Sequence, residues 1–248
     1  MKPDPADVRA AHSVARCLLD QALPGAVNMA RDAALLSCRL QPTLRFYQWL
    51  RPTLSLGYFQ AAADLPLEQF KAQGFDLVRR RTGGKAILHH LEQTYSLCFP
   101  EDLLPHKGPA NLMRELHQCL ADEINQQAEL DVQVRSEQKL ASDIPGSPWC
   151  FEDSSALDLV QGRRKLVGSA ARRSAGWILF HGSLVIKAPE QTPRIAELGF
   201  SPDVEGIRCA FGQLMGLDFE VGKWELEELE ASERLKQQFE SQNFLLRT

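Results

Sequence analysis

A cysteine in a loop that contains proline and glycine is the strongest candidate nucleophile in this chain. Cys150 lies in IPGSPWCF (144–151), and Lys165 follows it 15 positions later. That separation lets the lysine return beside the cysteine across one hairpin, where a cation favours the reactive thiolate. A lysine near a reacting carbonyl also stabilises developing negative charge. The pattern predicts a nucleophilic Cys150 assisted by Lys165, and a structural thiol is the alternative.

The remaining cysteines show no sign of a shared function. Cys17, Cys38 and Cys119 fall on helix-like stretches and Cys98 falls in a strand-like run, so all four are expected to be structural. The six cysteines form no CxxC pair. A disulfide framework or a metal site is therefore not expected, and a reduced cytoplasmic protein is the natural interpretation.

A second segment, VRRRTGGKAILHH (78–90), places two glycines directly after a predicted strand. Gly83 and Gly84 allow the backbone to approach a ligand closely. The basic residues around them are Arg79, Arg80, Arg81 and Lys85. These features predict a site for an acyl group attached to an anion, such as a phosphopantetheine arm or an adenylate. A solvated hairpin is the alternative, and the spacing matches neither a Walker loop nor GxGxxG.

Two further segments carry small residues on predicted strands. Gly168, Ser169 and Ala170 follow Lys165 in GRRKLVGSAARR (162–173) and leave room for a ligand against the strand. In HGSLVI (181–186), His181 and Gly182 are expected to line the same pocket. A basic surface hairpin and a structural histidine are the alternatives, and no catalytic role is assigned to His181.

The elements that must position these residues alternate between helices and strands. Apolar spacing predicts helices over 26–40, 109–127 and 224–241, the last with Leu226, Leu229 and Leu235 inside. Asp64 is expected to cap a short helix that Gly74 ends. Strands are expected at 53–59, 75–79 and 132–134, with three more between 156 and 186. This order predicts a mixed sheet with helices packed on it.

Length, composition and net charge limit the classes of protein to which this chain can belong. The chain has 248 residues, 44% of them hydrophobic and 24% charged, with a formal net charge of -4. No Pro/Gly-rich linker divides it, so one domain over 1–248 is expected. The charge gives no general attraction to nucleic acid or anionic lipid. No apolar run approaches the length of a signal peptide core or a membrane span, so neither is expected.

Together, four segments resemble the lipoate–protein ligase and octanoyltransferase family, which shares its fold with biotin–protein ligases. The similar segments, in family order, are RFYQWLRPTLSLGYFQ (45–60), RRRTGGKAILHHLEQTYSL (79–97), KLVGSAARR (165–173) and HGSLVI (181–186). The resemblance covers a core of about 26–215, followed by the helical tail at 224–241. It implies a mixed α/β (α+β) domain of the biotin/lipoate protein ligase type.

Within that family the chain most resembles the cysteine-dependent octanoyltransferases, because Cys150-Phe151 occupies the place of their CF pair. The resemblance implies transfer of octanoyl from acyl carrier protein to a lysine of a lipoyl domain, such as glycine cleavage H protein, with no cofactor. It implies Cys150 and Lys165 as catalytic residues. The implied substrate-binding residues are Arg79, Arg80, Thr82, Gly83, Gly84, Ala86, His89, Gly168, Ser169, Ala170, His181 and Gly182.

Three alternatives stay open. One is an ATP-dependent lipoate–protein ligase that uses ATP and Mg²⁺ and in which Cys150 is incidental. Another is an amidotransferase that moves octanoyl between two lipoyl-domain proteins, and a third is a non-catalytic acyl-binding protein. His90, Gln93 and Ala171 depart from the common family pattern, which leaves the preferred acyl donor open.

Overall fold

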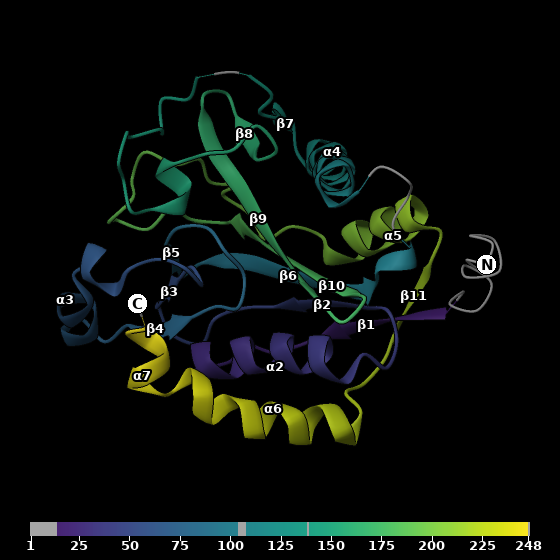
Figure 1. The fold of residues 1–248 in the computed structure, drawn as a ribbon. Helices are drawn as coiled ribbons and strands as arrows, with labels where there is room; N and C mark the ends of the chain where they lie inside the picture. The colour runs from purple at the N-terminus through teal and green to yellow at the C-terminus, as the bar shows by residue number, and fades with distance from the viewer. Residues whose placement is uncertain (1–13, 104–107, 138, 248) are drawn as a thin grey trace.

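A mixed sheet of eight strands forms the centre of the molecule (Figure 1). The computed structural model describes residues 14–103, 108–137 and 139–247. The strand order is β11-β1-β2-β6-β10-β9-β8-β7. In chain order the strands are β1 (Val14–Leu19), β2 (Thr43–Tyr47), β6 (Glu92–Pro100), β7 (Val132–Val134), β8 (Leu159–Gln161), β9 (Arg164–Ser174), β10 (Trp177–Val185) and β11 (Asp218–Val221).

The connections explain which strands run parallel. β1 pairs in parallel with β2 and β11, and helix α2 (Gly25–Cys38) supplies the crossover that a parallel β1–β2 pair needs. The strands from β6 to β7 pair antiparallel and are joined partly by tight turns. Ala175 and Gly176 both have positive φ, 48° and 77°, as a two-residue hairpin turn requires.

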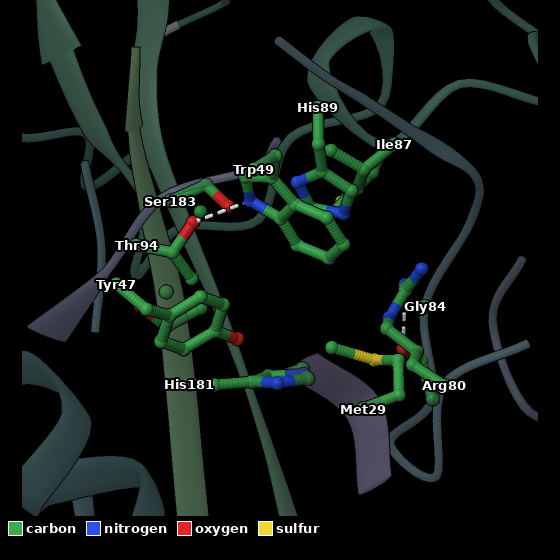
Figure 2. A pocket seen from close by; sticks show the side chains of 16 residues that line it. Met29, Tyr47, Trp49, Arg80, Gly84, Ile87, His89, Thr94, His181 and Ser183 are labelled. Carbon is green, nitrogen blue, oxygen red and sulfur yellow. Dashed lines mark hydrogen bonds between the residues drawn. The ribbon is translucent and has the colours of Figure 1, made fainter. Parts of the chain in front are cut away.

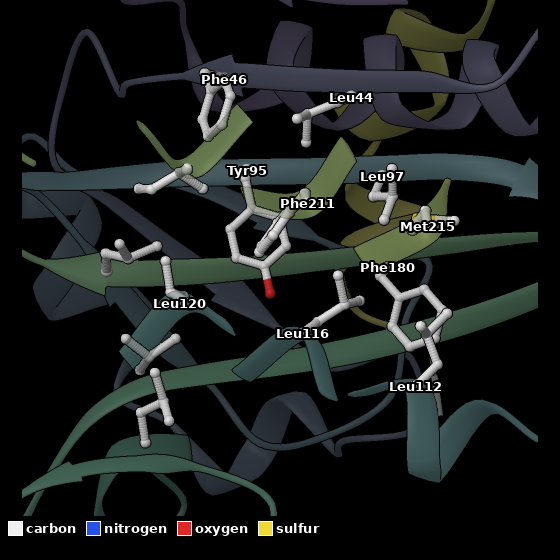
Figure 3. Packing of buried hydrophobic residues seen from close by; sticks show 14 of the residues in the cluster. Leu44, Phe46, Tyr95, Leu97, Leu112, Leu116, Leu120, Phe180, Phe211 and Met215 are labelled. Atoms are coloured by element: carbon white, nitrogen blue, oxygen red, sulfur yellow. The ribbon is translucent and has the colours of Figure 1, made fainter. Parts of the chain in front are cut away.

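One face of this sheet packs on helices α4 (Pro109–Gln127) and α5 (Val204–Met215) and is apolar. Figure 3 shows Leu112, Leu116 and Leu120 of α4 pointing toward Phe180 and Tyr95 of the strands. The helix predicted over 109–127 is confirmed, with its apolar stripe buried. This face therefore supplies the main hydrophobic core.

The opposite face packs on α2, which in turn packs on α6 (Leu226–Phe239) (Figure 1). Here the sheet buries charge: the Arg45 guanidinium lies 2.7 Å from both Asp20 and Asp32 and donates to the Asn28 side chain. Asp32 also accepts from Ser96. A buried charge is tolerated only when it is paired and hydrogen-bonded, and this face meets both conditions.

A second sheet, β4-β3-β5, carries the glycine segment. Its strands are β3 (Thr53–Leu56), β4 (Asp76–Arg79) and β5 (Ile87–His89). Short helices α3 (Leu67–Ala72) and α7 (Gln242–Leu245) lie beside it. The loop between β4 and β5 (80–86) contains Gly83 and Gly84 and is called the glycine loop below. Gly57 packs so closely on this loop that a Cβ on Gly57 would lie 1.7 Å from the Gly84 carbonyl oxygen.

Most of the predicted elements are confirmed, and three details are wrong. Asp64 lies in a separate 3-10 turn (Ala62–Asp64) and caps nothing, because α3 begins only after Pro66. Leu226 is 72% exposed, since α6 turns the face of Ala231 and Phe239 inward instead. Cys17 lies in β1, not in a helix. In the described parts of the chain, no helix has the length and apolarity needed to cross a membrane.

Candidate functional site

The Cys150 segment is held against the glycine loop by backbone hydrogen bonds. The Cys150 amide donates to the Ala86 carbonyl at 2.8 Å, and the Ala86 amide donates to Pro148 at 3.0 Å. Cys150 then opens a short 3-10 helix, Cys150–Glu152. This bridge fixes the thiol next to the loop, which the sequence separation of more than sixty residues does not reveal.

Lys165 reaches Cys150 because β9 contains a bulge. Leu159 pairs with Val167 and Val160 pairs with Lys165, so β9 has one extra residue at this point. Strict alternation would place Lys165 on the same side as Val167, and a bulge re-aims a side chain. The Lys165 ammonium consequently lies on the Gly168 side of the strand, where a Cβ on Gly168 would be 3.0 Å from Nζ.

The Lys165 ammonium has three neighbours. It lies 2.8 Å from the Asp158 carboxylate, donates to the Cys150 carbonyl at 2.9 Å and approaches the Cys150 Sγ at 3.6 Å. Burial alone would lower the pKa of Lys165, but Cys150 and Asp158 beside it raise that pKa above its ordinary value. The lysine is therefore held as a cation against the sulfur.

Asp158 is in turn held by its own loop. Its carboxylate accepts from the Ser155 amide at 2.6 Å. The neighbouring Leu157 carbonyl accepts from Nδ1 of the buried His117, and His117 Nε2 accepts from Ser169. A carbonyl can only accept, so Nδ1 carries the proton. Burial lowers the pKa of His117, which agrees with a neutral ring.

Next to Cys150 a cavity crosses four neighbouring strands. About 460 Å³ of space not filled by atoms lies within it, counting the part open to solvent. The lining residues are Met29, Tyr47, Trp49, Arg80, Gly83, Gly84, Ile87, His89, Thr94, Cys150, Gly168, Ser169, Ala170, His181, Gly182 and Ser183. Gly182 must be small, because a Cβ there would lie 2.3 Å from the Ser169 hydroxyl oxygen.

The glycine loop covers one side of this cavity, and this cover is called the roof below. A hydrogen bond between Thr82 and His181 holds it to the sheet. Thr82 Oγ1 and His181 Nε2 are 2.5 Å apart, and His181 Nδ1 lies 3.4 Å from Asp32. A carboxylate only accepts, so Nδ1 donates to Asp32 and Nε2 accepts from Thr82. Burial lowers the pKa of His181, with Asp32 opposing that effect. Gly84, at φ +90°, adopts a backbone conformation that favours glycine.

Beneath the roof, Arg80 ties the loop together from inside. It donates to the Ser55, Gly83 and Lys85 carbonyls at 2.7 to 3.1 Å. Burial lowers the pKa of Arg80 to about 10, so it remains a cation at neutral pH.

A buried polar network closes the side of the cavity formed by Trp49. Figure 2 shows Trp49 and His89 across the cavity from His181 and Met29. Trp49 stacks on His89 with 3.9 Å between ring centroids, and both donate to Glu92 at 2.9 and 2.7 Å. Burial would raise the pKa of Glu92, but His89 and nearby hydroxyls keep it below its usual value. This wall is therefore fixed.

The family model described as the lipoyl protein ligase A/B catalytic domain matches residues 24–193, which include the cavity and the Cys150–Lys165 contact. The chain belongs to this family. Two similar proteins carry the name octanoyltransferase LipM. One, from Brevibacillus brevis, is 36% identical over 69% of this chain and 65% of its own. The other, from Carboxydothermus hydrogenoformans, is 35% identical over 83% and 78%. The chain thus spans less than two thirds of the Brevibacillus relative.

Solved structures share the fold of this family member. A bi-partite lipoate protein ligase from Thermoplasma acidophilum superposes with a TM-score of 0.74 at 19% identity, over 95% of this chain and 97% of its own. A lipoate-protein ligase A bound with ATP gives 0.73 at 22% identity, over 94% and 98%. At these identities the likeness establishes the mixed α/β fold that the sequence predicted.

The structure brings most of the predicted site residues of this family member together. Those that line the cavity are Arg80, Gly83, Gly84, His89, Cys150, Gly168, Ser169, Ala170, His181 and Gly182. Lys165 lies against Cys150. Thr82 and Ala86 lie outside the lining, where Thr82 fastens the roof to His181 and Ala86 holds the Cys150 segment.

Arg79, which the family resemblance placed among the substrate-binding residues, is not at the cavity. This residue lies outside the lining and donates to the carbonyls of Gly57, Gln60 and Leu245 at 2.7 Å each. Lys85 is also engaged, with the Ser147 carbonyl and the Asp153 carboxylate. The sequence shows which residues are positively charged, but not which of them already donate hydrogen bonds to backbone carbonyls.

Sequence reasoning missed Asp158, Trp49 and Tyr47. Asp158 could have been found from the sequence. It is an acidic residue just before β8, and the hairpin that turns at Gly162 brings it opposite Lys165. Trp49 and Tyr47 belong to the segment 45–60 that carried part of the resemblance, but as apolar residues they do not stand out from the core. No group of three or more His, Cys, Asp and Glu residues in the described ranges is arranged to hold a metal ion.

Proposed function

We propose that this protein is an octanoyltransferase that moves octanoyl from acyl carrier protein to a lysine of a lipoyl domain through a thioester on Cys150. The supporting observation is the Cys150 sulfur, 3.6 Å from the Lys165 ammonium and at the lining of a cavity suited to an acyl chain. The names of the similar LipM proteins support the same reaction. In this proposal residues 1–248 act as one catalytic domain.

The first step forms an acyl-enzyme. The Cys150 thiolate attacks the donor thioester carbonyl, and a C–S bond forms as the carbonyl oxygen becomes an oxyanion. The intermediate then collapses and the bond to the carrier sulfur breaks, so the carrier leaves as a thiolate that takes up a proton. Covalent catalysis of this kind divides one difficult transfer into two easier ones.

Lys165 is suited to the oxyanion because of how its three N–H bonds are used. One is directed to Asp158, one to the Cys150 carbonyl and one to the Cys150 sulfur. Once the sulfur is acylated it is a poor acceptor, and the third N–H becomes available to the carbonyl oxygen. A preorganised charge in a buried site stabilises the developing oxyanion more strongly than water does.

The second step returns the enzyme to its starting state. The neutral amine of the acceptor lysine attacks the Cys150 thioester, and a C–N bond forms. The C–S bond breaks, the amine loses a proton, and Cys150 leaves as a thiolate beside Lys165. No oxidant, nucleotide or metal enters this balance, so the proposal needs no cofactor.

The cavity gives the acyl chain a direction. Its lining residues from the main sheet belong to β9, β10, β6 and β2, which are neighbours in that order, and three strand spacings of about 4.8 Å make roughly 14 Å. An extended eight-carbon chain spans about 8–9 Å, at roughly 1.2 Å per bond. With its carbonyl at Cys150 beside β9, octanoyl would point toward Tyr47 and Trp49.

The acceptor in this proposal is a lipoyl domain, with glycine cleavage H protein as a specific candidate, and the reaction takes place in the cytoplasm. The implied substrate-binding roles of the cavity residues follow the same geometry. Arg80, Thr82 and His181 would hold the roof, and the small residues of β9 would leave the chain its space.

A transfer assay without nucleotide tests the proposal. Purified protein, octanoyl-acyl carrier protein and an apo lipoyl domain are mixed without ATP or Mg²⁺, and the acceptor mass is followed. Addition of one octanoyl group to the acceptor is expected. If modification instead requires lipoate and ATP and releases pyrophosphate, the protein is a ligase and the proposal is wrong. Replacing the carrier donor with octanoylated H protein separates the amidotransferase reaction, which would use that donor faster.

A further inference from the structure

Three arginines surround one half-exposed tyrosine beside the roof of the cavity. The Arg247 and Arg172 guanidinium carbons lie 4.1 and 4.9 Å from the centre of the Tyr58 ring. Arg81 adds its charge from the roof loop, and together the three lower the pKa of Tyr58, Arg247 most strongly through a hydrogen bond. The next residue, Phe59, is 82% exposed and packs its edge on Tyr58.

Among the described residues, no carboxylate neutralises the charge of this cluster. Among the ion pairs of the described residues, none joins a carboxylate to Arg81, Arg172 or Arg247. Arg81 donates to the neutral Gln238, and its Nε is buried with no hydrogen-bond partner in the part of the chain that the structure describes. Neighbouring Arg173 differs, because it has Glu101 at 3.7 Å. Clustered arginines without acids are costly to keep together unless an anion meets them.

The cluster is joined to the site. The Tyr58 amide donates to the Thr82 carbonyl at 2.9 Å. Phe59 lines an open groove that also touches Lys85, Pro148 and Gly84, and Gly84 lines the acyl cavity as well. A partner seated on the arginines and Phe59 therefore lies beside the opening that leads to Cys150.

We propose that Tyr58, Phe59, Arg81, Arg172 and Arg247 form the docking surface for the acidic carrier protein that delivers the acyl thioester. This inference rests on the proposed function and names the partner surface of the same site. An exposed aromatic residue flanked by arginines has the composition typical of a protein interface. Carboxylates on the partner supply the charge that the arginines lack.

Distance favours the acyl donor over the lysine acceptor as the occupant. Lys165 Nζ lies beside Gly168, and Arg172 follows four residues further along β9, about 13 Å away. A phosphopantetheine arm of about a dozen bonds spans roughly 15 Å, whereas a lysine side chain spans only about 6 Å. A partner seated at the arginines therefore needs the longer arm to bring its carbonyl to the Cys150 sulfur.

The test compares Arg172→Gln/Arg247→Gln with Arg173→Gln, an exposed arginine one position along the same strand that already has a carboxylate neighbour. Binding of unacylated holo-acyl carrier protein is measured by fluorescence anisotropy at low and high salt. Acylation of Cys150 is measured separately with octanoyl-acyl carrier protein, with octanoyl-coenzyme A and with octanoyl-pantetheine, which has neither protein nor phosphate.

The double variant is expected to bind the carrier protein about tenfold more weakly at low salt and to lose most of the salt dependence. Its acylation by octanoyl-pantetheine and octanoyl-coenzyme A should match wild type, and Arg173→Gln should match wild type throughout. Unchanged carrier binding overturns the inference. So does an equal loss with octanoyl-pantetheine, which would mean a distorted site, or with octanoyl-coenzyme A, which would mean a phosphate site. A failure of the proposed function gives a different result: the wild-type protein would bind the carrier protein, but Cys150 would not be acylated.

Discussion

The two faces of the eight-stranded sheet are built in opposite ways. Toward α4 and α5 the strands present an almost wholly apolar surface. Toward α2 they bury Arg45, Glu92 and His181 in hydrogen-bonded networks around the cavity, one of which includes Asp32 of α2. The apolar face can be assembled by burial alone, whereas the polar face costs desolvation at each charge. The comparison indicates that stability comes chiefly from the first face and that the second keeps the shape of the site.

Two cysteines show the same contrast at single residues. Cys98 is fully buried in β6, and burial raises the pKa of its thiol well above the usual value. Cys150 is half-buried and has the Lys165 ammonium 3.6 Å from its sulfur. Surroundings, and not residue type, distinguish a structural thiol from one placed to act as a nucleophile, which is the role proposed for Cys150.

Substituting these two cysteines should give the largest difference in octanoyl transfer rate. Cys150→Ala is expected to lower octanoyl transfer by about 10³-fold or more, because the proposed nucleophile is gone. Cys98→Ala should retain the transfer rate of the folded protein. Both are measured as octanoylated lipoyl domain formed per minute. A Cys150→Ala protein as active as Cys98→Ala would mean that the thiol takes no part.

Removing the Lys165 charge should have the next largest effect. Lys165→Met is expected to slow acyl-enzyme formation by about 10²–10³-fold, the range found for loss of an oxyanion donor. It also leaves Asp158 buried without its cation, which lowers stability. The Lys165→Met/Asp158→Asn protein serves as the control, since it should recover stability but not rate. Recovery of the wild-type rate in that double variant would remove Lys165 from the chemistry.

Asp158→Asn alone should give a smaller loss with a distinctive pH signature. The Asp158 carboxylate helps to raise the pKa of Lys165 against the effect of burial, so its loss lowers that pKa. The lysine then loses its proton at a lower pH, and the alkaline limb of the acylation rate moves toward neutrality. At neutral pH a loss of roughly tenfold is expected, equal to about 1.4 kcal/mol. An alkaline limb that does not move would show that Asp158 does not set the charge of Lys165.

A substitution on the apolar face should affect stability while leaving chemistry nearly untouched. Leu120 is fully buried in the core under α4, and Leu120→Ala is expected to lower the free energy of unfolding by about 2–5 kcal/mol. Denaturant unfolding measures that cost, and single-turnover acylation well below the transition measures activity. A folded Leu120→Ala protein with tenfold slower acylation would contradict the division between the two faces.

The sequence was sufficient for the features that depend on local pattern. The spacing of Leu112, Leu116 and Leu120 predicted α4 with the bounds it has, and the three strands expected between 156 and 186 are β8, β9 and β10. The order of four motifs pointed to the fold, and the hairpin length brought Lys165 toward Cys150.

What the sequence could not give depends on register and on competition for hydrogen bonds. The bulge that turns Lys165 toward Gly168 is a shift of one residue, which no apolar pattern marks. Arg79 resembles an anion ligand until the backbone carbonyls it satisfies are known. Leu226 fits the helical spacing of α6, yet the packing of that helix on α2 leaves it exposed.

The intact mass of the protein after brief mixing with octanoyl-acyl carrier protein, without ATP, tests the central claim most directly. Wild type should gain one octanoyl group, peptide mapping should place it on Cys150, and an apo lipoyl domain or hydroxylamine should remove it. Cys150→Ala should gain nothing. An octanoyl group on another residue, or transfer to the lipoyl domain by Cys150→Ala, would contradict the thioester route.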